Sequence, residues 1–267
     1  METALMNPLN LDEITQYVND NIDDFHTRRL EILSALTLSA LVRKNPYLFR
    51  AKNIGKASEL VEGTMSALLS SSEEEQFGRF LEGLAIFVAQ KATGGVKSSA
   101  PGVDLEFVSD GTHYVVSIKS GPNWGNSSQQ KKLGEDLQKA VVRLKQGRVT
   151  ADSILGICYG KTRTRRHPER GYLKLVGQNF WAFISGSKTL YTDIIVPLGY
   201  KAKEHNDLYL QKLNNMSNLL TVQFGEMFCG ADGAIDWDRL VRANSGNFDL
   251  NKQGVSEIVC NQKSTTV

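Results

Sequence analysis

Two carboxylates and an ammonium group are expected to gather at one end of a predicted β-hairpin. The Asp-Gly pair at 110–111 lies between two runs of alternating apolar residues, the strongest short-range signal for a two-residue hairpin turn. Folding the chain there places Asp104 opposite Ser117 and brings Glu106 and Lys119 to the same face. Carboxylate oxygens bind hard divalent cations, and an ammonium group can neutralise negative charge that develops in a reaction. The end of the hairpin farthest from the turn can therefore support metal-assisted chemistry.

The polar face of this hairpin also has an ordinary structural interpretation. Because side chains alternate with period two, His113 and Val115 share the face of the carboxylates and the lysine. Solvated sheet faces are usually charged, and an exposed ion pair is worth only ~0.2–1 kcal/mol. Both interpretations stay open on the residues alone. The opposite face is predicted to enter the core through Val103, Leu105, Phe107, Tyr114, Val116 and Ile118.

The hairpin carries a short motif. The chain enters it through Pro101-Gly102-Val103-Asp104 and leaves it through Ser117-Ile118-Lys119, and an amide-rich run, Ser120–Gln130, follows. This arrangement resembles the PD-(D/E)XK motif of type II restriction endonucleases and related nucleases, and the resemblance runs from about residue 45 to residue 199. One position departs from the pattern: where the family usually has Asp or Glu two residues before the lysine, this chain has Ser117.

The resemblance implies a catalytic site on the hairpin that hydrolyses a phosphodiester bond. Lys119 would orient or deprotonate the attacking water, and a Mg²⁺ cofactor would polarise the phosphate. Because an acid is missing two residues before the lysine, either Glu82 or Glu106 would supply the second carboxylate. The implied catalytic residues are Asp104, Lys119, Ser117 and Glu82, and the implied metal-binding groups are Asp104, Glu82, Glu106 and the backbone carbonyl of Ile118.

The resemblance also implies the partners of the protein. The substrate would be double-stranded DNA, cut at a short symmetric sequence that a homodimer matches best. A cognate DNA methyltransferase would belong to the same restriction-modification system without direct contact, and both would work in the cytoplasm of a bacterium or archaeon. Two alternatives are a resolvase or repair nuclease with the same catalytic core, and an inactive DNA-binding protein, for which Ser117 is the best argument.

Two segments are candidates for DNA contact. Amides of the 121–130 run can pair with adenine edges, and arginines of the dense basic cluster at 161–170 suit phosphates and guanine. The alternatives are turn chemistry and helix capping for the amides, and an ordinary solvated surface for the charges. The candidate DNA-binding residues are Ser120, Asn123, Trp124, Asn126, Ser127, Ser128, Gln129, Lys161, Arg163, Arg165 and Arg166.

Helices are predicted on the N-terminal side of the hairpin. Apolar spacing predicts helices over 9–44 and over 57–69, the latter closed by the serine run at 70–72. Those serines and the three glutamates after them have the composition of an N-cap and acidic first turn for another helix over 73–91. Glu82 lies within this apolar helix, either on its solvated flank or pointing at the hairpin.

After the hairpin, helical and extended segments alternate. A helix is predicted over 129–146 and strands over 153–159 and 172–176. A helix over 179–185, a helix or strand over 190–196, and helices over 204–227 and 235–241 complete the series. This order predicts an α/β or α+β core with a mixed central sheet flanked by helices, which the resemblance would make restriction-endonuclease-like.

One nuclease domain over 1–267 is the expected domain organisation. It comprises a helical N-terminal region (1–72), a catalytic core (73–200), a helical C-terminal region (201–245) and a flexible tail (246–267).

Composition excludes few functions. At 267 residues and 41% hydrophobic content, the chain can bury a substantial core. Since the net charge is only +2, a nucleic-acid surface would have to come from local clustering. No apolar run reaches the ~18 residues of a membrane span, and no signal pattern opens the chain. Cys158, Cys229 and Cys260 form no CxxC pair, which disfavours a zinc site or disulfide framework and agrees with a reducing cytoplasm.

Overall fold

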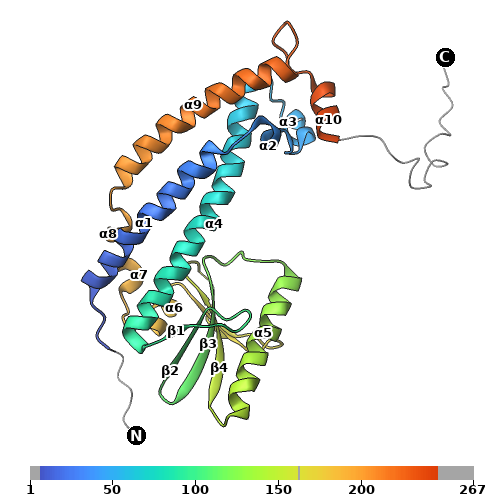
Figure 1. Cartoon of the computed structure of the whole chain (residues 1–267). Coiled ribbons are helices and arrows are strands. Elements are labelled where there is room, and N and C mark those ends of the chain that lie inside the picture. Colours follow the sequence, from blue (N-terminus) through green and yellow to red (C-terminus); the bar gives the residue numbers. More distant parts are fainter. Residues whose placement is uncertain (1–6, 162, 246–267) are drawn as a thin grey trace, which may run out of the picture. The chain divides into compact units, whose positions relative to one another are not determined.

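The computed structural model describes residues 7–161 and 163–245, and within them the fold is mixed α+β, as the sequence predicted (Figure 1). The predicted flexible tail at 246–267 lies outside the described residues. The helices are α1 (Leu11–Ser34), α2 (Leu38–Val42), α3 (Pro46–Ala51), α4 (Ala57–Thr93), α5 (Ser127–Gln146), α6 (Gln178–Ser185), α7 (Leu190–Asp193), α8 (Ile195–Leu198), α9 (Ala202–Phe228) and α10 (Trp237–Ser245). The strands are β1 (Val96–Lys97), β2 (Leu105–Ser109), β3 (Thr112–Lys119), β4 (Ala151–Ile157), β5 (Arg165–Arg166) and β6 (Leu173–Val176).

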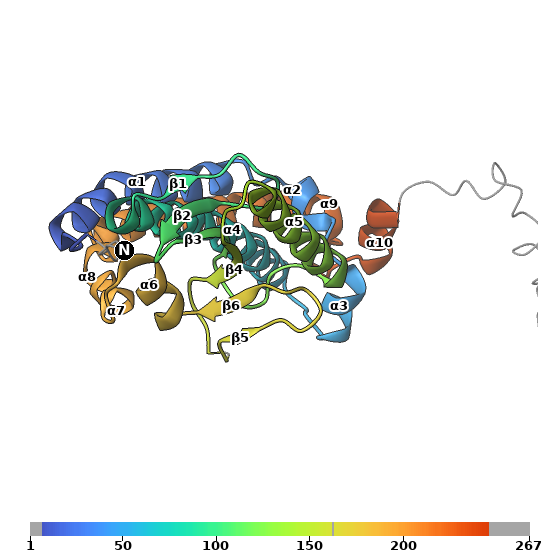
Figure 2. The same ribbon diagram turned by 90° about the horizontal axis from the view of Figure 1, so that it is seen from below.

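A mixed six-stranded sheet is built from the segment between Val96 and Val176. Its strands lie in the order β1-β2-β3-β4-β6-β5, which can be followed in Figure 2. The three central strands β3, β4 and β6 run parallel, because helix α5 returns the chain between β3 and β4 to the starting end of the sheet. The outer pairs β1–β2, β2–β3 and β5–β6 are antiparallel. The carboxyl ends of β3, β4 and β6 therefore lie at one edge.

The register of the predicted hairpin is confirmed. Ser109 pairs with Thr112 and Leu105 with Val116, so the turn falls at Asp110 and Gly111. Both turn residues have positive φ angles, 46° and 71°, as a two-residue hairpin turn of the favoured type requires.

Helices cover both faces of the sheet, so the second face of the hairpin is not a solvated charged surface. On one face, Leu105, Val116 and Ile118 pack with side chains of α1, α4 and α6. On the other, α5 contributes Leu133, Leu137 and Ala140, which pack with Val115, Leu155 and Ile157 of the strands. Val115 and Ser117 are accordingly buried, at 1% exposure each.

The assignment of Val103 to the first face was wrong. This side chain packs with Val115 and the α5 residues on the second face. The reason is that β2 begins only at Leu105 and the chain turns at Pro101 and Gly102, where glycine has a φ of 71°. The two-residue alternation of a strand does not extend through such a turn.

One continuous helix, α4, replaces the two helices predicted over 57–69 and 73–91. It runs from Ala57 to Thr93, and the serines at 70–72 lie within it instead of capping a new helix. Serine costs only a few tenths of a kcal/mol in a helix interior. Buried side chains on both sides of the serines, such as Met65, Leu69 and Phe80, outweigh this cost.

The other sequence-based assignments past the hairpin are confirmed with shifts of a few residues. The segment predicted as a helix or strand over 190–196 forms the short helices α7 and α8. The helix predicted over 235–241 begins at Trp237, because Ile235 forms an antiparallel bridge with Cys229. No helix among the described residues is long and apolar enough to cross a membrane.

The chain divides into two compact units. Unit 1 comprises Met1–Ile32 and Leu69–Gln211 and contains the sheet. Unit 2 comprises Leu33–Leu68 and Lys212–Val267. Within unit 2, α10 packs on α2 and α3, where the Arg50 guanidinium lies 5.6 Å from the ring centroid of Trp237. All the candidate site residues belong to unit 1.

Candidate active site

Asp104 is held at the open end of the hairpin by its own strand partner. Its Oδ2 accepts hydrogen bonds from the Ile118 backbone N–H at 2.6 Å and from the Ser117 hydroxyl at 3.1 Å. Its backbone N–H donates to the Val116 carbonyl at 2.9 Å. The carboxylate is therefore fixed in position and half-buried, so it is neither free in solvent nor sealed in the core.

The Ile118 carbonyl points to the same side as Asp104. Successive carbonyls of a strand point to opposite sides. The Lys119 carbonyl accepts from the Cys158 N–H on the β4 side, whereas the Val116 carbonyl accepts from Asp104 on the β2 side. The Ile118 carbonyl therefore faces the β2 side, beyond the end of β2, where Asp104 lies.

Lys119 ends β3, and its side chain is half-buried. Its ammonium nitrogen lies 5.8 Å from the ring centroid of Trp124, within the range of a cation–π contact. Among the described residues, no carboxylate lies close enough to Lys119 to form an ion pair. The positive charge is therefore available to a group outside the chain.

Glu82 reaches this end of the hairpin from α4. Gly78, one helical turn before it, lies so close to Ser120 that a Cβ at Gly78 would be 3.1 Å from the Ser120 hydroxyl oxygen. Because residues four apart share a helix face, Glu82 also faces the end of β3. Burial raises the pKa of Glu82; nearby Lys119 opposes this shift and nearby Asp104 adds to it. The predicted alternative in which Glu82 points at the hairpin is therefore the one the structure adopts.

Glu106 lies elsewhere and is fully engaged by neighbours. Its two carboxylate oxygens bond to the Ser98 hydroxyl at 2.5 Å and to the His113 Nε2 at 2.9 Å. It pairs with Val115, two residues along the strand from the Asp104 end. The structure thus brings together Asp104, Lys119, Ser117, Glu82 and the Ile118 carbonyl, and it keeps Glu106 apart.

The amide-rich run mainly stabilises the start of α5. Asn126 caps this helix, and it and Gln129 each accept a hydrogen bond from the other's backbone N–H, at 3.0 and 2.8 Å. Ser127 and Ser128 form the first turn. Asn123 is exposed and Trp124 half-buried. The helix-capping alternative therefore describes Asn126 and Gln129, while Asn123 keeps an exposed amide.

The cations of the basic cluster differ in whether a carboxylate pairs with them. Arg166 forms a bidentate ion pair with Asp152, at 2.9 and 2.6 Å, and also donates to the Gly171 carbonyl at 2.6 Å. Lys161, Arg163 and Arg165 are exposed. Within residues 7–161 and 163–245, none of these three forms an ion pair with a carboxylate.

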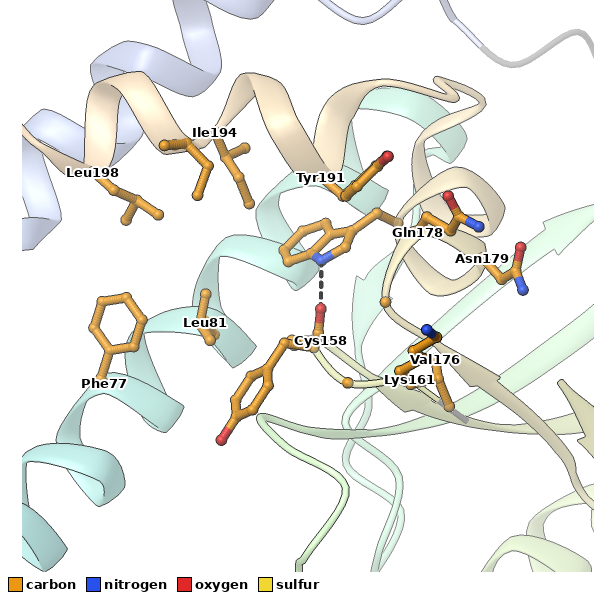
Figure 3. Close-up of a pocket in the computed structure, with 15 residues that line it drawn as sticks. Phe77, Leu81, Cys158, Lys161, Val176, Gln178, Asn179, Tyr191, Ile194 and Leu198 are labelled. Carbon is orange, nitrogen blue, oxygen red and sulfur yellow. Dashed lines mark hydrogen bonds between the residues drawn. The ribbon is translucent and has the colours of Figure 1, made fainter. Parts of the chain in front are cut away.

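A pocket that no sequence motif indicated lies next to the ends of β4 and β6. It has a volume of about 570 Å³ and is lined by apolar side chains of α4, α7 and α8 and by the chain just after β4 and β6 (Figure 3). Cys158 lines it, and burial raises the pKa of this thiol far above its usual range. No sequence periodicity could have revealed this pocket, because its walls come from four separate segments.

Comparison with known families identifies the chain. Residues 12–206 match the family model for the type II restriction endonuclease EcoO109I. The chain belongs to this restriction endonuclease family. The match includes the hairpin, the basic cluster, the pocket and most of unit 1. A comparison with curated proteins found no match.

Membership of the restriction endonuclease family implies that the substrate is DNA. Enzymes of such a family are nucleases that act on DNA, and the helix-flanked mixed sheet is consistent with a restriction-endonuclease-like core. In the described part of the chain, no three His, Cys, Asp or Glu side chains group as metal ligands. A metal at this site would therefore depend on backbone and substrate oxygens in addition to carboxylates.

Proposed function

We propose that this protein is a Mg²⁺-dependent type II restriction endonuclease of the PD-(D/E)XK type, which cuts double-stranded DNA at a short specific sequence. One observation carries the proposal. A carboxylate anchored by the strand opposite it, Asp104, lies at one edge of the sheet with a partly buried glutamate, Glu82, and with Lys119, which has no ion-pair partner among the described residues.

The groups present suit Mg²⁺ in type and number. Mg²⁺ prefers oxygen ligands and is usually held by one or two carboxylates together with substrate phosphates and waters. Asp104, Glu82 and the Ile118 carbonyl would supply three such oxygens. Bound there, Mg²⁺ would polarise the scissile phosphate and lower the pKa of a bound water.

Each side chain has a separate task in hydrolysis. Lys119 would orient the attacking water and neutralise charge on the phosphoryl oxygens as the bond to the leaving oxygen breaks. Ser117, in place of the usual acid, donates to Asp104 and keeps its carboxylate aimed at the site. Glu82 would supply the second carboxylate from α4. Glu106, engaged by Ser98 and His113, would not take part.

DNA would lie across the edge formed by the ends of β3, β4 and β6. The exposed cations Lys161, Arg163 and Arg165 would contact phosphates or bases, and Asn123 and Trp124 would face the groove. A symmetric recognition sequence would be matched by a homodimer, with a cognate methyltransferase protecting host DNA in the same cytoplasm.

The decisive experiment is digestion of plasmid and phage DNA with and without Mg²⁺. Wild-type protein should give a fixed set of fragments only with Mg²⁺. The Asp104→Ala and Lys119→Ala variants should lose cleavage by about 100-fold or more while still binding DNA, because each removes a group that stabilises the transition state. Lys188→Ala, at an exposed lysine after α6, is the matched control and should cut normally.

Other results would favour the alternatives. Full cleavage by Lys119→Ala would refute the catalytic assignment. Cleavage confined to junctions or ends would indicate a resolvase or repair nuclease. Binding without any Mg²⁺-dependent cleavage by wild-type protein would indicate an inactive DNA-binding protein.

A further inference from the structure

The pocket beside the candidate active site has an apolar interior and a polar rim. Its interior is apolar and partly aromatic, with Phe77 and Leu81 on α4 facing Ile194 and Leu198 across the cavity (Figure 3). At about 570 Å³ it falls within the range of small-molecule sites and can hold a planar ring with its attached sugar.

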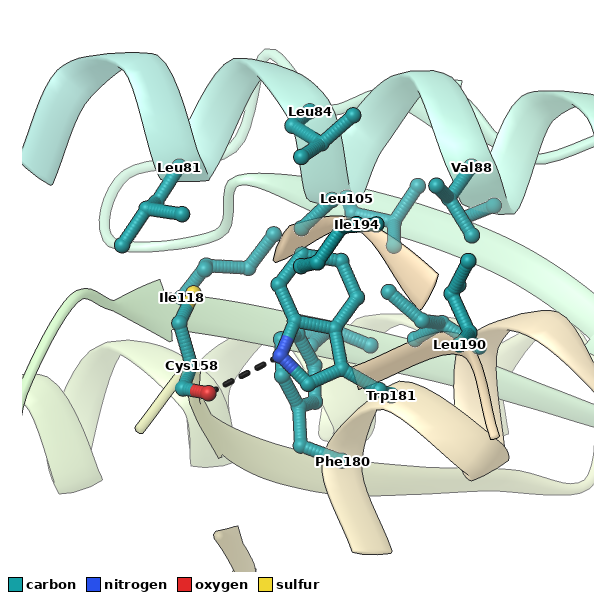
Figure 4. Packing of buried hydrophobic residues seen from close by; sticks show 14 of the residues in the cluster. Leu81, Leu84, Val88, Leu105, Ile118, Cys158, Phe180, Trp181, Leu190 and Ile194 are labelled. Atoms are coloured by element: carbon teal, nitrogen blue, oxygen red, sulfur yellow. Dashed lines mark hydrogen bonds between the residues drawn. The ribbon is translucent and has the colours of Figure 1, made fainter. Parts of the chain in front are cut away.

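One wall of the pocket is a fixed indole. Trp181 donates from Nε1 to the Cys158 carbonyl at 2.9 Å, and its ring packs among Leu84, Leu190 and Ile194 (Figure 4). Two further rings flank the cavity, those of Tyr159 and Tyr191, which are 55% and 40% exposed. Exposed aromatic rings beside a rigid apolar wall offer stacking surfaces to another planar group.

The rim of the pocket is polar and positively charged. Lys161, Gln178 and Asn179 line it, and all three are exposed. Asn179 donates from its amide nitrogen to the Thr164 hydroxyl at 2.9 Å, which fixes the amide with its oxygen available as an acceptor. The cation can bind an anionic group, and the two amides can form hydrogen bonds to donors and acceptors on the edge of a planar ring. The pocket therefore matches a ligand that combines an anionic group with such a ring.

The pocket adjoins the residues proposed to cut DNA. Leu81 lines the pocket, and Glu82 follows it on α4. Cys158 also lines the pocket, and its N–H bonds to the Lys119 carbonyl at 2.9 Å. The pocket is therefore joined to the proposed catalytic residues through α4 and through the ends of β3 and β4.

We propose that this pocket receives one nucleotide that the enzyme extrudes from its DNA duplex. The base would stack on the aromatic rings, the amides of Gln178 and Asn179 would bond its edge, and Lys161 would contact the adjoining phosphate. Stacking in the pocket would offset part of the free energy needed to unstack and unpair the base. The inference rests on the proposed nuclease function and adds a nucleotide subsite to it.

The test begins once digestion has located the recognition sequence. Duplexes that carry a single mismatch at each position in and around that sequence are titrated with wild-type protein, with Ca²⁺ in place of Mg²⁺. A mismatch removes part of the extrusion cost, so at one position it should tighten binding about tenfold or more. At positions read by base contacts it should weaken binding instead.

A pair of neighbouring substitutions then links this effect to the pocket. Ile195 and Val196 are 65% and 82% exposed on α8, but only Ile195 lines the pocket. Ile195→Trp should fill the opening and abolish the mismatch-dependent tightening, while Val196→Trp should retain it. Because both side chains are exposed, neither change should unfold the protein.

The outcomes separate this inference from the proposed function. Cleavage by the wild type, with no position at which a mismatch tightens binding, would overturn the nucleotide subsite alone. So would an Ile195→Trp variant that keeps the tightening. Absence of any Mg²⁺-dependent cleavage would overturn the proposed function and this inference with it.

Discussion

Glu82 and Glu106 are two carboxylates near the same hairpin, and the chain treats them in opposite ways. Glu106 receives a hydrogen bond from Ser98 and a contact from His113, so both of its oxygens have partners within the fold. No described side chain or backbone N–H donates a hydrogen bond to Glu82, and burial raises its pKa. A carboxylate that is partly buried without donors is destabilised in its charged form unless a cation joins it.

This contrast indicates which glutamate is suited to a metal. A carboxylate with satisfied oxygens would have to break two contacts to bind a cation. Glu82 would gain from one, because a cation would offset both its burial and its repulsion from Asp104. Partly buried acids with perturbed pKa values are concentrated at functional sites for this reason.

The sharpest test exchanges each glutamate for its neutral amide. Glu82→Gln should lower Mg²⁺-dependent cleavage by about 100-fold or more, because it removes a charged ligand from the metal. Glu106→Gln is the matched control and should stay within about threefold of wild type, since it lies outside the proposed ligand set. Single-turnover cleavage rates measure both. The reverse order would show that Glu106 is the second acid.

A smaller effect is expected at the hydroxyl that replaces the usual acid. Ser117→Ala removes one of the two hydrogen bonds to Asp104, worth about 1 kcal/mol, so cleavage should fall about fivefold. Because Ser117 acts through Asp104, half-maximal cleavage should also require more Mg²⁺.

Ser153→Ala provides the control for this hydroxyl. Ser153 is also buried, at 7% exposure, and lies on the neighbouring strand β4 opposite Val115. It should leave the Mg²⁺ requirement unchanged. An equal shift in both variants would mean that Ser117 serves packing alone.

The smallest effect concerns stability and pH. Because the pKa of Glu82 is raised in the folded state from its ordinary value of 4.5, the folded protein holds this proton more tightly than the unfolded chain does. Stability contributed by the neutral form is complete below the unfolded pKa and is lost as pH rises through the folded value. The amide of Glu82→Gln does not ionise, so the free energy of unfolding of the variant relative to wild type should increase as pH rises above 4.5.

Urea unfolding in EDTA measures this difference in the absence of divalent metal. A difference between the two proteins that does not change with pH would show that Glu82 is as well solvated in the folded protein as in the unfolded chain.

Local rules predicted the hairpin well but left open whether Glu82 or Glu106 lies beside Asp104. The turn at 110–111 fixes the register of both strands, so the placement of Asp104 beside Ser117 followed from sequence. The choice between Glu82 and Glu106 did not, because it depends on how α4 is rotated against the sheet. Gly78 settles that rotation by its close approach to Ser120, a contact between residues far apart in the chain.

Two further features of the fold depend on contacts between residues far apart in the sequence, so local rules did not predict them. α5 buries the second face of the hairpin, and the burial of Ser117 follows from that packing and not from its neighbours in sequence. The continuity of α4 through the serines at 70–72 likewise depends on side chains that pack on both sides of them. Composition favoured a cap at these serines, and tertiary packing overrode it.

Backbone hydrogen bonds continue to join the two chain segments that follow β3 and β4. The Cys158 N–H bonds to the Lys119 carbonyl at 2.9 Å, and the Tyr159 N–H bonds to the Ser120 carbonyl at 3.1 Å. The lysine proposed for catalysis and the loop that leads to the exposed cations thus share one rigid frame. A non-cognate DNA sequence that displaced this loop would also displace Lys119. A mismatched recognition sequence would therefore lower the cleavage rate as well as the binding affinity.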